Sequence, residues 1–406
     1  MTGEARTSDG DEQPLDGLTV LDASRVLVGP FCTMQLGDLG AEVIKVERPD
    51  GGDQTRGWHP PTYGEESAYY VSINRNKRSL TLNLASEEGR EVFRDLAAEA
   101  DVLVENFRVG KMEEWGLDYG TLSEANPELV YCSLSGYGEW GPQKDRPAYD
   151  IMMQAEGGLM SITGEEDGPP VRVGVAIADI GAGMYATQAI LAALLYRELG
   201  DGTGQKIDVS LLDGQVAWMS YMASYYFATG DPPGRMGSKH PTIAPYQAFE
   251  TSDGYVVVAT ASENLWPKFC RALDREDLID DERFAVNADR VANRSDLDRI
   301  LDEEFEQYST AEAVARMEEA GVPVSRVRDM EDVFEHPQVQ ARDMHRTVDH
   351  PTIGSVEMAG SPMHFSRTPT EIDRHPPLLG EHTEAILDEF GYDEATIADL
   401  AERDVI

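Results

Sequence analysis

The chain has 406 residues, of which 41% are hydrophobic, so it can bury a core large enough for two domains or for one domain with an insertion. It carries 75 Asp and Glu residues against 34 Lys and Arg residues, which gives a formal net charge of -41. A polyanion of this kind repels nucleic acid and anionic membranes, so we expect neither as a partner. Acids dispersed over the whole chain, together with few lysines, are typical of proteins from a high-salt cytoplasm and indicate a halophilic protein.

Cysteine and histidine spacing argues against a metal site. Cys32, Cys132 and Cys270 lie far apart in the sequence, which predicts a reducing compartment without disulfides. The eight histidines show neither H-x-x-x-H nor H-E-x-x-H spacing. The N-terminal stretch MTGEARTSDGDEQP has no basic and apolar signal, and no apolar run reaches the roughly 20 residues of a membrane span. We therefore expect a cytoplasmic protein without a bound metal ion.

Strand and helix signals alternate along the first half of the chain. Such alternation predicts an α/β fold, in which a parallel sheet carries helices on both faces in a Rossmann-like domain. The predicted elements are strands at 18–24, 41–49, 78–84, 101–107 and 130–138, with helices at 29–40 and 87–100.

The pattern changes after a predicted strand at 206–212. An aromatic helix is expected over 213–230, with its rings in the core or at a subunit interface. The segment 231–249 is rich in Pro and Gly and marks a boundary. A small second domain is expected over 225–330, with linkers on either side.

The C-terminal part is expected to return to the first domain. A strand or two near 352–367 and a helix over 381–391 are too little to form a domain alone. We therefore predict a discontinuous large domain made of 15–220 and 335–406.

The stretch RVGVAIADIGAGMYATQAIL (172–191) holds one acid, Asp179, between an apolar run and a glycine-rich turn that is expected to open into an alanine-rich helix. One interpretation is that Asp179 caps the helix. Another is that its carboxylate is ionised at the helix N-terminus, beside glycines that let a substrate approach. GAGMYA also fits the dinucleotide fingerprint, with Glu198 and Asp201 near the ribose position, but Asp179 would repel the pyrophosphate. A nicotinamide-dependent dehydrogenase remains an alternative.

Basic residues gather at predicted strand ends in this otherwise acidic chain. NRNKRS (74–79) concentrates three of them. Open α/β sheets bind ligands at the carboxyl ends of their strands, so these cations are candidates for binding a phosphate-bearing ligand. The alternative is that they form salt bridges with the abundant acids. The other basic residues at or near strand ends are Lys45, Arg48, Arg56, Arg108 and Lys111.

Long segments of the chain resemble the family III CoA transferases, which include formyl-CoA, carnitine and mesaconyl-CoA transferases and, as a related branch, the methylacyl-CoA racemases. The resemblance covers nearly the whole chain in the family's order. It implies an interlocked homodimer, with the active site between the large Rossmann-like domain of one subunit and the small inserted domain of its partner. The segments that carry it are LDASRVLVGPFCTMQLGDLGAEVIKVERPDGGDQTRG, NRNKRSLTLNL, VENFRVG, YCSLSGYGEWGP, GVAIADIGAGMYA, HPTIAPYQAFETSDGYVVVA and PPLLGEHTEAIL.

The resemblance implies that Asp179 is the nucleophile. Its carboxylate attacks an acyl-CoA thioester, an aspartyl-CoA thioester forms, and an incoming carboxylic acid leaves as the new CoA ester. Coenzyme A is then part of the substrate, and no tightly bound cofactor is expected. Short dicarboxylates such as succinate and mesaconate are the expected acids, because a halophile's carbon metabolism could use them. The implied CoA-binding residues are Val26, Arg48, Asn106, Phe107, Arg108, Lys111 and Tyr137, and the implied substrate-loop residues are Gly237 and His240.

Two positions depart from relatives within this family. The racemases use a histidine in a G-H-D stretch, where this chain reads PAYDIM with Tyr149. Tyrosine, with an ordinary pKa of about 10, is a poor base at neutral pH, so transfer is favoured over racemisation. Leu27 stands where one family member has glutamine, which implies a different acyl substrate.

Overall fold

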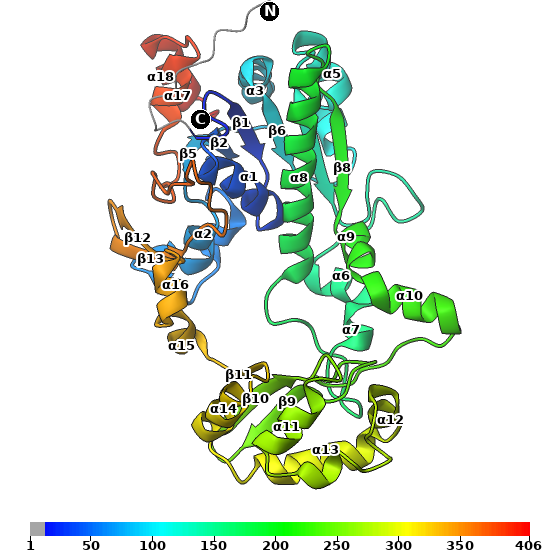
Figure 1. Ribbon diagram of the computed structural model, residues 1–406. Coiled ribbons are helices and arrows are strands. Elements are labelled where there is room, and N and C mark those ends of the chain that lie inside the picture. Colours follow the sequence, from blue (N-terminus) through cyan, green and yellow to red (C-terminus); the bar gives the residue numbers. More distant parts are fainter. Residues whose placement is uncertain (1–12) are drawn as a thin grey trace, which may run out of the picture. The chain divides into compact units, whose positions relative to one another are not determined.

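The computed structural model describes residues 13–406 (Figure 1). The chain divides into two compact units. The first unit runs to Gly158 and also comprises Val173–Ser220 and Gln338–Ile406. The second comprises Leu159–Arg172 and Tyr221–Pro337. It therefore includes the segment 159–172, which the sequence analysis placed in the large domain.

The first unit is built on a six-stranded sheet in the order β5-β2-β1-β6-β7-β8, with every neighbouring pair parallel. The order runs outward from β1 in both directions, as in a Rossmann sheet, and places a ligand crevice beyond the carboxyl ends of β1 and β6. The predicted α/β fold with a parallel sheet is confirmed. The strands are β1 (Thr19–Ala23), β2 (Glu42–Glu47), β5 (Lys77–Thr81), β6 (Val102–Glu105), β7 (Val130–Ser135) and β8 (Lys206–Ser210).

Each central strand contributes side chains to two apolar cores, one on each face of the sheet, because successive side chains point to opposite faces. Leu21 and Ala23 belong to one apolar cluster and Val20 to the other. Figure 1 shows α1 (Val28–Asp38) and α8 (Ile177–Leu199) side by side on one face. The opposite face is covered by α3 (Glu87–Glu99), α5 (Tyr119–Ala125), α17 (Thr383–Glu389) and α18 (Glu394–Glu402).

The glycines of GAGMYA lie inside α8, not in a turn between a strand and a helix. A Cβ atom on Gly181 would come within 2.3 Å of the Trp218 ring, and one on Gly183 within 2.8 Å of the Val28 carbonyl oxygen. These glycines therefore allow close packing of the helix. The dinucleotide fingerprint is wrong, and with it the expectation of a glycine-rich turn open to substrate, because a helix interior offers no loop to hold a pyrophosphate.

Helix α8 is long and apolar. Among residues 13–406 it is the one helix whose length and composition would allow it to cross a membrane, and half of its most apolar window is buried within the chain. Ala182, Ala186 and Ile190 of this helix belong to one of the two apolar clusters of the first unit.

The aromatic helix expected over 213–230 is two helices. α9 (Leu211–Trp218) and α10 (Ser220–Thr229) are separated at Ser220, which has a left-handed φ of 43°. No residue of α10 is buried, so its aromatic rings are not part of the core. The strands expected near 352–367 form a hairpin that begins earlier, β12 (His345–His350) and β13 (Gly354–Ala359).

Short elements lie in the connections between the parallel strands and near the boundaries of the two units. The connection from β7 to β8, which carries Asp150 and Asp179, is longer than the connection from β2 to β5, which carries Trp58 and Tyr69. These elements are η1 (Gln54–Gly57), β3 (Thr62–Tyr63), β4 (Glu66–Ser67), α2 (Ala68–Ser72), α4 (Lys111–Trp115), α6 (Asp150–Glu156) and, close to the unit boundaries, α7 (Leu159–Ile162) and α16 (Pro337–Ala341).

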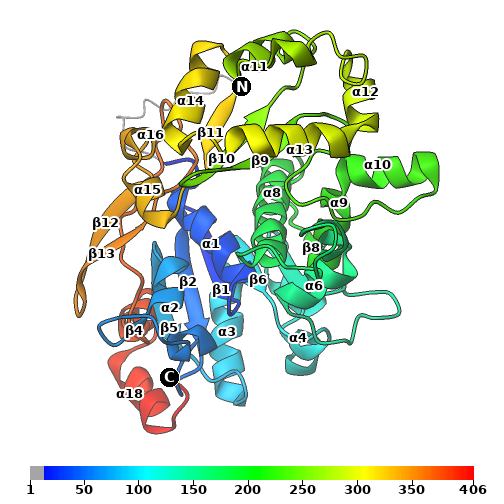
Figure 2. The ribbon, with the colours of Figure 1, turned by 90° about the horizontal axis from the view of Figure 1, so that it is seen from below.

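The second unit has its own core around an antiparallel sheet in the order β11-β10-β9 (Figure 2). Phe249 and Phe305 stack at its centre, with ring centroids 4.5 Å apart. Its elements are β9 (Tyr246–Thr251), β10 (Gly254–Ala259), β11 (Val324–Arg326), α11 (Trp266–Ala272), η2 (Glu276–Leu278), α12 (Asn287–Ala292), α13 (Arg294–Phe305), α14 (Thr310–Glu319) and α15 (Met330–Phe334).

Candidate active site

Asp179 lies in the first turn of α8 but does not cap the helix. The N-cap residue is Ala176, which makes no side-chain cap hydrogen bond. The capping interpretation is therefore wrong. The Asp179 carboxylate is half-buried, and it has no hydrogen bond or ion pair within residues 13–406. A carboxylate without a partner at a helix N-terminus is free to react.

Asp150, the first residue of α6, fixes the N-terminus of α8. One of its oxygens accepts the backbone N–H of Ala178 at 2.8 Å, and the other accepts Nε2 of Gln154 at 2.7 Å. Oε1 of Gln154 in turn accepts the backbone N–H of Val173 at 2.9 Å. Burial first, and then the negative charge of Asp150, raise the pKa of Asp179 to about 7. Asp150 thus orients the turn that carries Asp179 and opposes its ionisation.

Tyr69 on α2 brings a hydroxyl close to these acids. Burial, followed by the charges of Asp179 and Asp150, raises the pKa of Tyr69 to about 12, so its hydroxyl keeps its proton at neutral pH. Trp58, which is 41% exposed, packs edge-on against the Tyr69 ring with a centroid distance of 5.0 Å. The two rings form an aromatic pair, of which Tyr69 is near enough to Asp179 for its pKa to respond to that charge.

The first turn of α1 lies beside the turn that carries Asp179. Gly183 is one helical turn after Asp179 on the same face of α8, and its Cα abuts the backbone of α1 at Val28. The N-cap residue of α1, Leu27, makes no side-chain cap hydrogen bond. The first backbone N–H groups of a helix lack intrahelical acceptors and favour negative charge, so this turn is suited to stabilising an oxyanion.

A cavity of about 300 Å³ occupies the predicted crevice at the carboxyl ends of β1, β2 and β6. Leu82 and Leu84 give it an apolar wall, and Phe107 packs edge-on against Trp115 at 5.1 Å. Arg48, which is exposed, is one of its charged lining residues. An apolar slot with aromatic rings and nearby guanidinium groups suits a nucleotide, whose base stacks and whose phosphates bind arginine.

The residues that the resemblance assigns to the CoA site are only partly brought together. Phe107 and Arg48 line the 300 Å³ cavity. Asn106 does not line it but holds Arg25, which does, through hydrogen bonds of 2.8 and 2.7 Å to the Arg25 backbone. Val26 is the next residue in the same turn. The CoA role of these four residues stays a prediction.

The other three assigned residues lie elsewhere on the first unit. Arg108 lines a separate cavity of about 210 Å³. Lys111 pairs with Glu114 at 2.8 Å. Tyr137 is buried in the sheet core, beneath the guanidinium group of Arg146 at 5.4 Å. Tyr137 lines neither the 300 Å³ cavity nor the 210 Å³ cavity.

Most of the basic residues near strand ends pair with acids. Buried pairs join Lys45 to Asp53 at 3.1 Å and Lys77 to Asp22 at 3.0 Å. The phosphate-binding interpretation is therefore wrong for these lysines, and the alternative of salt bridges is correct. The same holds for Arg56 with Glu47, Arg75 with Asp38 and Arg78 with Glu389.

Gly237 and His240 belong to the second unit. The Gly237 N–H donates to the Gly164 carbonyl at 2.8 Å, with a left-handed φ of 60° at Gly237. The His240 ring stacks on Tyr221 with a centroid distance of 6.1 Å, and Arg294 donates to the His240 carbonyl at 2.7 Å. The segment is thus anchored inside its own unit, and its role over a substrate stays a prediction.

Trp58, Tyr69 and Asp150 were missed by sequence reasoning. Asp150 lies in PAYDIM, the stretch compared with the racemase G-H-D motif, but only Tyr149 was considered there. Trp58 and Tyr69 lie in no motif with catalytic spacing, and their signal was the aromatic content of the Pro-rich stretch around Trp58, which is typical of a functional loop.

Comparisons with known proteins decide the family. The sequence model of CoA-transferase family III matches residues 15–383. The chain belongs to this family. The CoA transferase is 43% identical over 406 residues to human "Succinyl-CoA:glutarate CoA-transferase", with 100% of this chain and 92% of the relative covered. It is 40% identical over 395 residues to "Succinyl-CoA:mesaconate CoA-transferase" of Haloarcula marismortui, covering 94% and 98%.

A solved structure agrees with this assignment. The CoA transferase matches the crystal structure of a CAIB/BAIF family protein from Brucella suis with a TM-score of 0.84 and 43% identity, covering 94% of this chain and 100% of that one. The protein is thus an enzyme of the CoA-transferase class, as the sequence analysis predicted.

Proposed function

We propose that the enzyme moves CoA between succinyl-CoA and a second short dicarboxylic acid, with Asp179 as the nucleophile. The observation that carries this proposal is the half-buried Asp179 carboxylate, which lacks any partner within residues 13–406 and lies beside the uncapped first turn of α1. An ordinary structural acid at such a position would hold a donor or a cation.

In the first half-reaction, one Asp179 oxygen attacks the thioester carbonyl of the acyl-CoA. The C–S bond breaks, CoA leaves as its thiolate, and a mixed anhydride joins Asp179 to the acyl group. The negative charge that develops on the carbonyl oxygen is stabilised by backbone N–H groups in the first turn of α1. The Tyr69 hydroxyl, which keeps its proton, is a second donor near the same carboxylate.

In the second half, the CoA thiolate attacks the Asp179 carbonyl of the anhydride and releases the first acid as a carboxylate. The resulting aspartyl-CoA thioester is attacked by the incoming carboxylate, and the same two steps run in reverse. CoA enters and leaves as part of a substrate, so the proposal requires no resident cofactor. The thiolate is positioned throughout because its nucleotide end stays bound.

We place the nucleotide end of CoA in the 300 Å³ cavity. Phe107 and Trp115 offer rings for the adenine, and Arg25 and Arg48 offer guanidinium groups for the phosphates. Arg25 lies over the Phe107 ring at 4.7 Å, which presents its charge at the edge of the cavity.

The choice of short dicarboxylates rests on the relatives. Both the human and the Haloarcula marismortui proteins carry names that join succinyl-CoA to a second dicarboxylate, glutarate in one and mesaconate in the other. Glutarate and mesaconate are therefore the acceptors to test first, with mesaconate as the acid we expected from the sequence.

We further propose that the enzyme is a homodimer of a high-salt cytoplasm. Met184, Leu195 and Leu199 on α8 are exposed by 43%, 59% and 77%, which is unusual for a helix of a monomeric polyanion. A second copy would cover them. The net charge of -41 keeps such a dimer soluble where salt screens repulsion.

The proposal is tested by replacing the nucleophile. Asp179→Asn keeps the size of the side chain and should abolish CoA exchange between succinyl-CoA and glutarate or mesaconate, while the circular dichroism spectrum stays that of the wild type. Borohydride should reduce, and hydroxylamine should cleave, a CoA adduct that mass spectrometry places on the peptide containing Asp179. Substantial exchange by the variant, or an adduct on another peptide, would refute the assignment.

A racemase reaction is the remaining alternative within the family. Tyr149, at the position of the racemase histidine, is the N-cap residue of α6 and is 64% exposed, so it is not held against a substrate within this chain. Racemisation would incorporate solvent deuterium at the α-carbon of a 2-methylacyl-CoA. We expect no such incorporation.

A further inference from the structure

The turn between β1 and α1 has a strained backbone. Val26 adopts a left-handed φ of 68°, which a β-branched side chain disfavours by about 1–3 kcal/mol. Such a conformation persists only where the surrounding structure enforces it. The turn runs directly from the cavity wall at Ser24 and Arg25 to the first turn of α1, beside Asp179.

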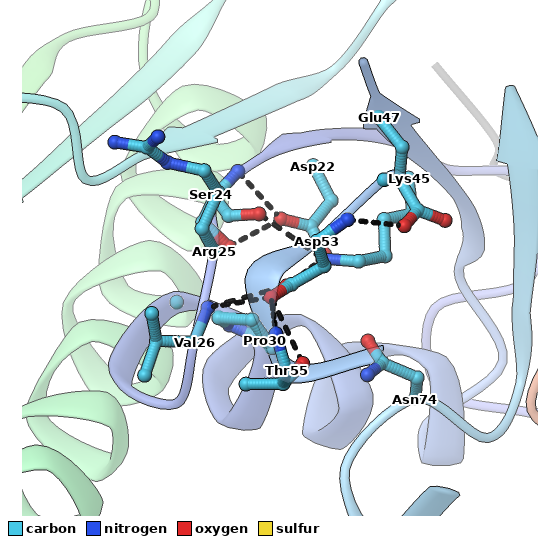
Figure 3. A network of polar contacts seen from close by, with 12 residues as sticks. Asp22, Ser24, Arg25, Val26, Pro30, Lys45, Glu47, Asp53, Thr55 and Asn74 are labelled. Atoms are coloured by element: carbon cyan, nitrogen blue, oxygen red, sulfur yellow. Dashed lines mark hydrogen bonds and ion pairs between the residues drawn. The ribbon is translucent and has the colours of Figure 1, made fainter. Parts of the chain in front are cut away.

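Side chains from three segments hold the backbone of this turn, and Figure 3 shows two of them, Asp22 and Asp53. The Ser24 N–H donates to Asp22 at 3.0 Å, and the Arg25 N–H donates to Asn106 at 2.8 Å. The strained residue itself is held by Asp53, since the Val26 N–H points between its two carboxylate oxygens at 3.4 and 3.2 Å. Within residues 13–406, Asp53 is thus the one side chain that hydrogen-bonds to the backbone of Val26.

Asp53 is itself fixed in place as an anion. Its carboxylate is fully buried, lies 3.1 Å from the Lys45 ammonium and accepts two hydrogen bonds of 2.9 Å from Thr55. Lys45 also donates to the Ser24 carbonyl at 3.0 Å, so the same cation holds the start of the turn. Burial alone would raise the pKa of Asp53, but Lys45 and Thr55 outweigh burial and lower it.

We infer that Asp53, with Lys45, is a positioning residue for CoA transfer, which clamps Val26 in its left-handed conformation and so aims the first turn of α1 at the thioester attacked by Asp179. The inference rests on the proposed function. It assigns no contact with substrate to Asp53. The role is to set the distance and angle between the cavity that holds CoA and the site of attack.

The test replaces one carboxylate oxygen with an amide group. In Asp53→Asn, an NH₂ group faces the Lys45 ammonium and the Val26 N–H, so donors oppose donors and the clamp opens. We expect the kcat for succinyl-CoA to fall about 100-fold, because small misplacements of reacting groups have effects of that size. The KM for succinyl-CoA should change by no more than about threefold, because Phe107 and Trp115 remain.

A second variant distinguishes positioning from a general loss of stability. Glycine adopts a left-handed φ without strain, so Val26→Gly in the Asp53→Asn background should recover about tenfold in kcat over Asp53→Asn alone. Val26→Gly alone supplies the reference for this double-mutant cycle. The matched control is Asp38→Asn, which breaks another buried pair, Asp38 with Arg75 at 2.7 Å, away from the turn. Asp38→Asn should fold and should keep the wild-type kcat.

Hydrogen exchange gives a readout that does not depend on activity. The peptide covering residues 24–31 should exchange faster in Asp53→Asn than in the wild type or in Asp38→Asn. Three results would overturn the inference. They are a wild-type kcat in Asp53→Asn, an equal loss of kcat in Asp53→Asn and in the control Asp38→Asn, and no recovery of kcat when Val26→Gly is added to Asp53→Asn. If the wild-type enzyme transfers no CoA at all, the proposed function fails, and the exchange rates alone then decide whether Asp53 clamps the turn.

Discussion

Asp150→Asn should make the enzyme relatively more active in acid. Asp150 raises the pKa of Asp179 through its negative charge, and it orients Ala178 through a hydrogen bond of 2.8 Å. The variant removes the charge but keeps an oxygen that can accept the Ala178 N–H. Its NH₂ group faces Nε2 of Gln154, so one buried hydrogen bond is lost, which lowers stability by about 1 kcal/mol.

The size of the effect follows from the causes of the raised pKa. The pKa of Asp179 rises from 3.8 to about 7, with burial as the larger cause and Asp150 as the smaller. Asp150 therefore accounts for less than half of the rise, so its removal should lower the pKa by about 1, equivalent to about 1.4 kcal/mol. At pH 5.5 the ionised fraction of Asp179 then grows from about 3% to about 24%, or about eightfold.

The assay is the single-turnover formation of the CoA adduct on Asp179 from succinyl-CoA, between pH 5.5 and 8.5 in molar salt. Each rate is divided by the plateau of its own variant, so that loss of orientation is separated from ionisation. Asp118→Asn serves as the control, because it removes one charge and still caps α5. The acidic limb of the pH–rate profile should move to lower pH in Asp150→Asn. A limb at the wild-type pH, or at a higher pH, would refute the reasoning.

Three further predictions concern packing and pH. Gly183→Ala places a methyl group against the Val28 carbonyl, so the Tm and kcat should both fall, with a loss of about 1–3 kcal/mol by urea unfolding. Phe305→Ala removes a fully buried ring from the second unit, and its free energy of unfolding should fall by about 3–5 kcal/mol in a urea titration. Burial lowers the pKa of His350 and of His382 in the folded state, so the unfolded chain binds protons more readily and stability falls as the pH drops below about 6.5. Urea unfolding at pH 7.5 and 5.5 measures this fall, which His382→Gln should reduce.

The sheet could be predicted from the sequence because its signal is local. Alternation of apolar runs with helical patterns fixes a parallel α/β unit, and the buried residues of β1 divide between two cores as the pleat requires. The number of helices after β8 could not be predicted, because the break at Ser220 is a single backbone angle without a Gly or Pro signal.

The site was only partly predictable. Asp179 stands alone as an acid in an apolar stretch, which is a signal in the sequence itself. The partner of each basic residue depends on the register between strands. Lys45 on β2 is the sheet neighbour of Asp22 on β1, and its ammonium group pairs with Asp53, which lies in the loop after β2. Whether a cation faces a buried acid or a ligand is thus decided by contacts that span the fold. The same is true of Asp150 and Tyr69.

A raised pKa does not by itself mark a nucleophile in this protein, and the comparison with Glu105 shows why. Burial raises the pKa of Glu105 to about 7, as it does for Asp179. Glu105 is 4% exposed and accepts hydrogen bonds from Ser133 at 2.6 Å and from the Phe107 N–H at 2.8 Å. The Glu105 oxygens therefore already hold donors, one of which belongs to Phe107 in the wall of the 300 Å³ cavity. The Asp179 oxygens have no donor within residues 13–406.

The same contrast separates Asp179 from the acids at the carboxyl ends of β1 and β2. Asp22 and Glu47 are buried, and each is matched by a cation and by hydroxyl groups. Burial would raise the pKa of Asp22, but Lys77 and Lys45 lower it to about 2. Salt screens exposed acids but reaches buried pairs much less, so these pairs hold the strand ends at any ionic strength. Asp179 differs from both acids, because its carboxylate is partly exposed and has no hydrogen bond or ion pair within residues 13–406. It is therefore the acid that can react.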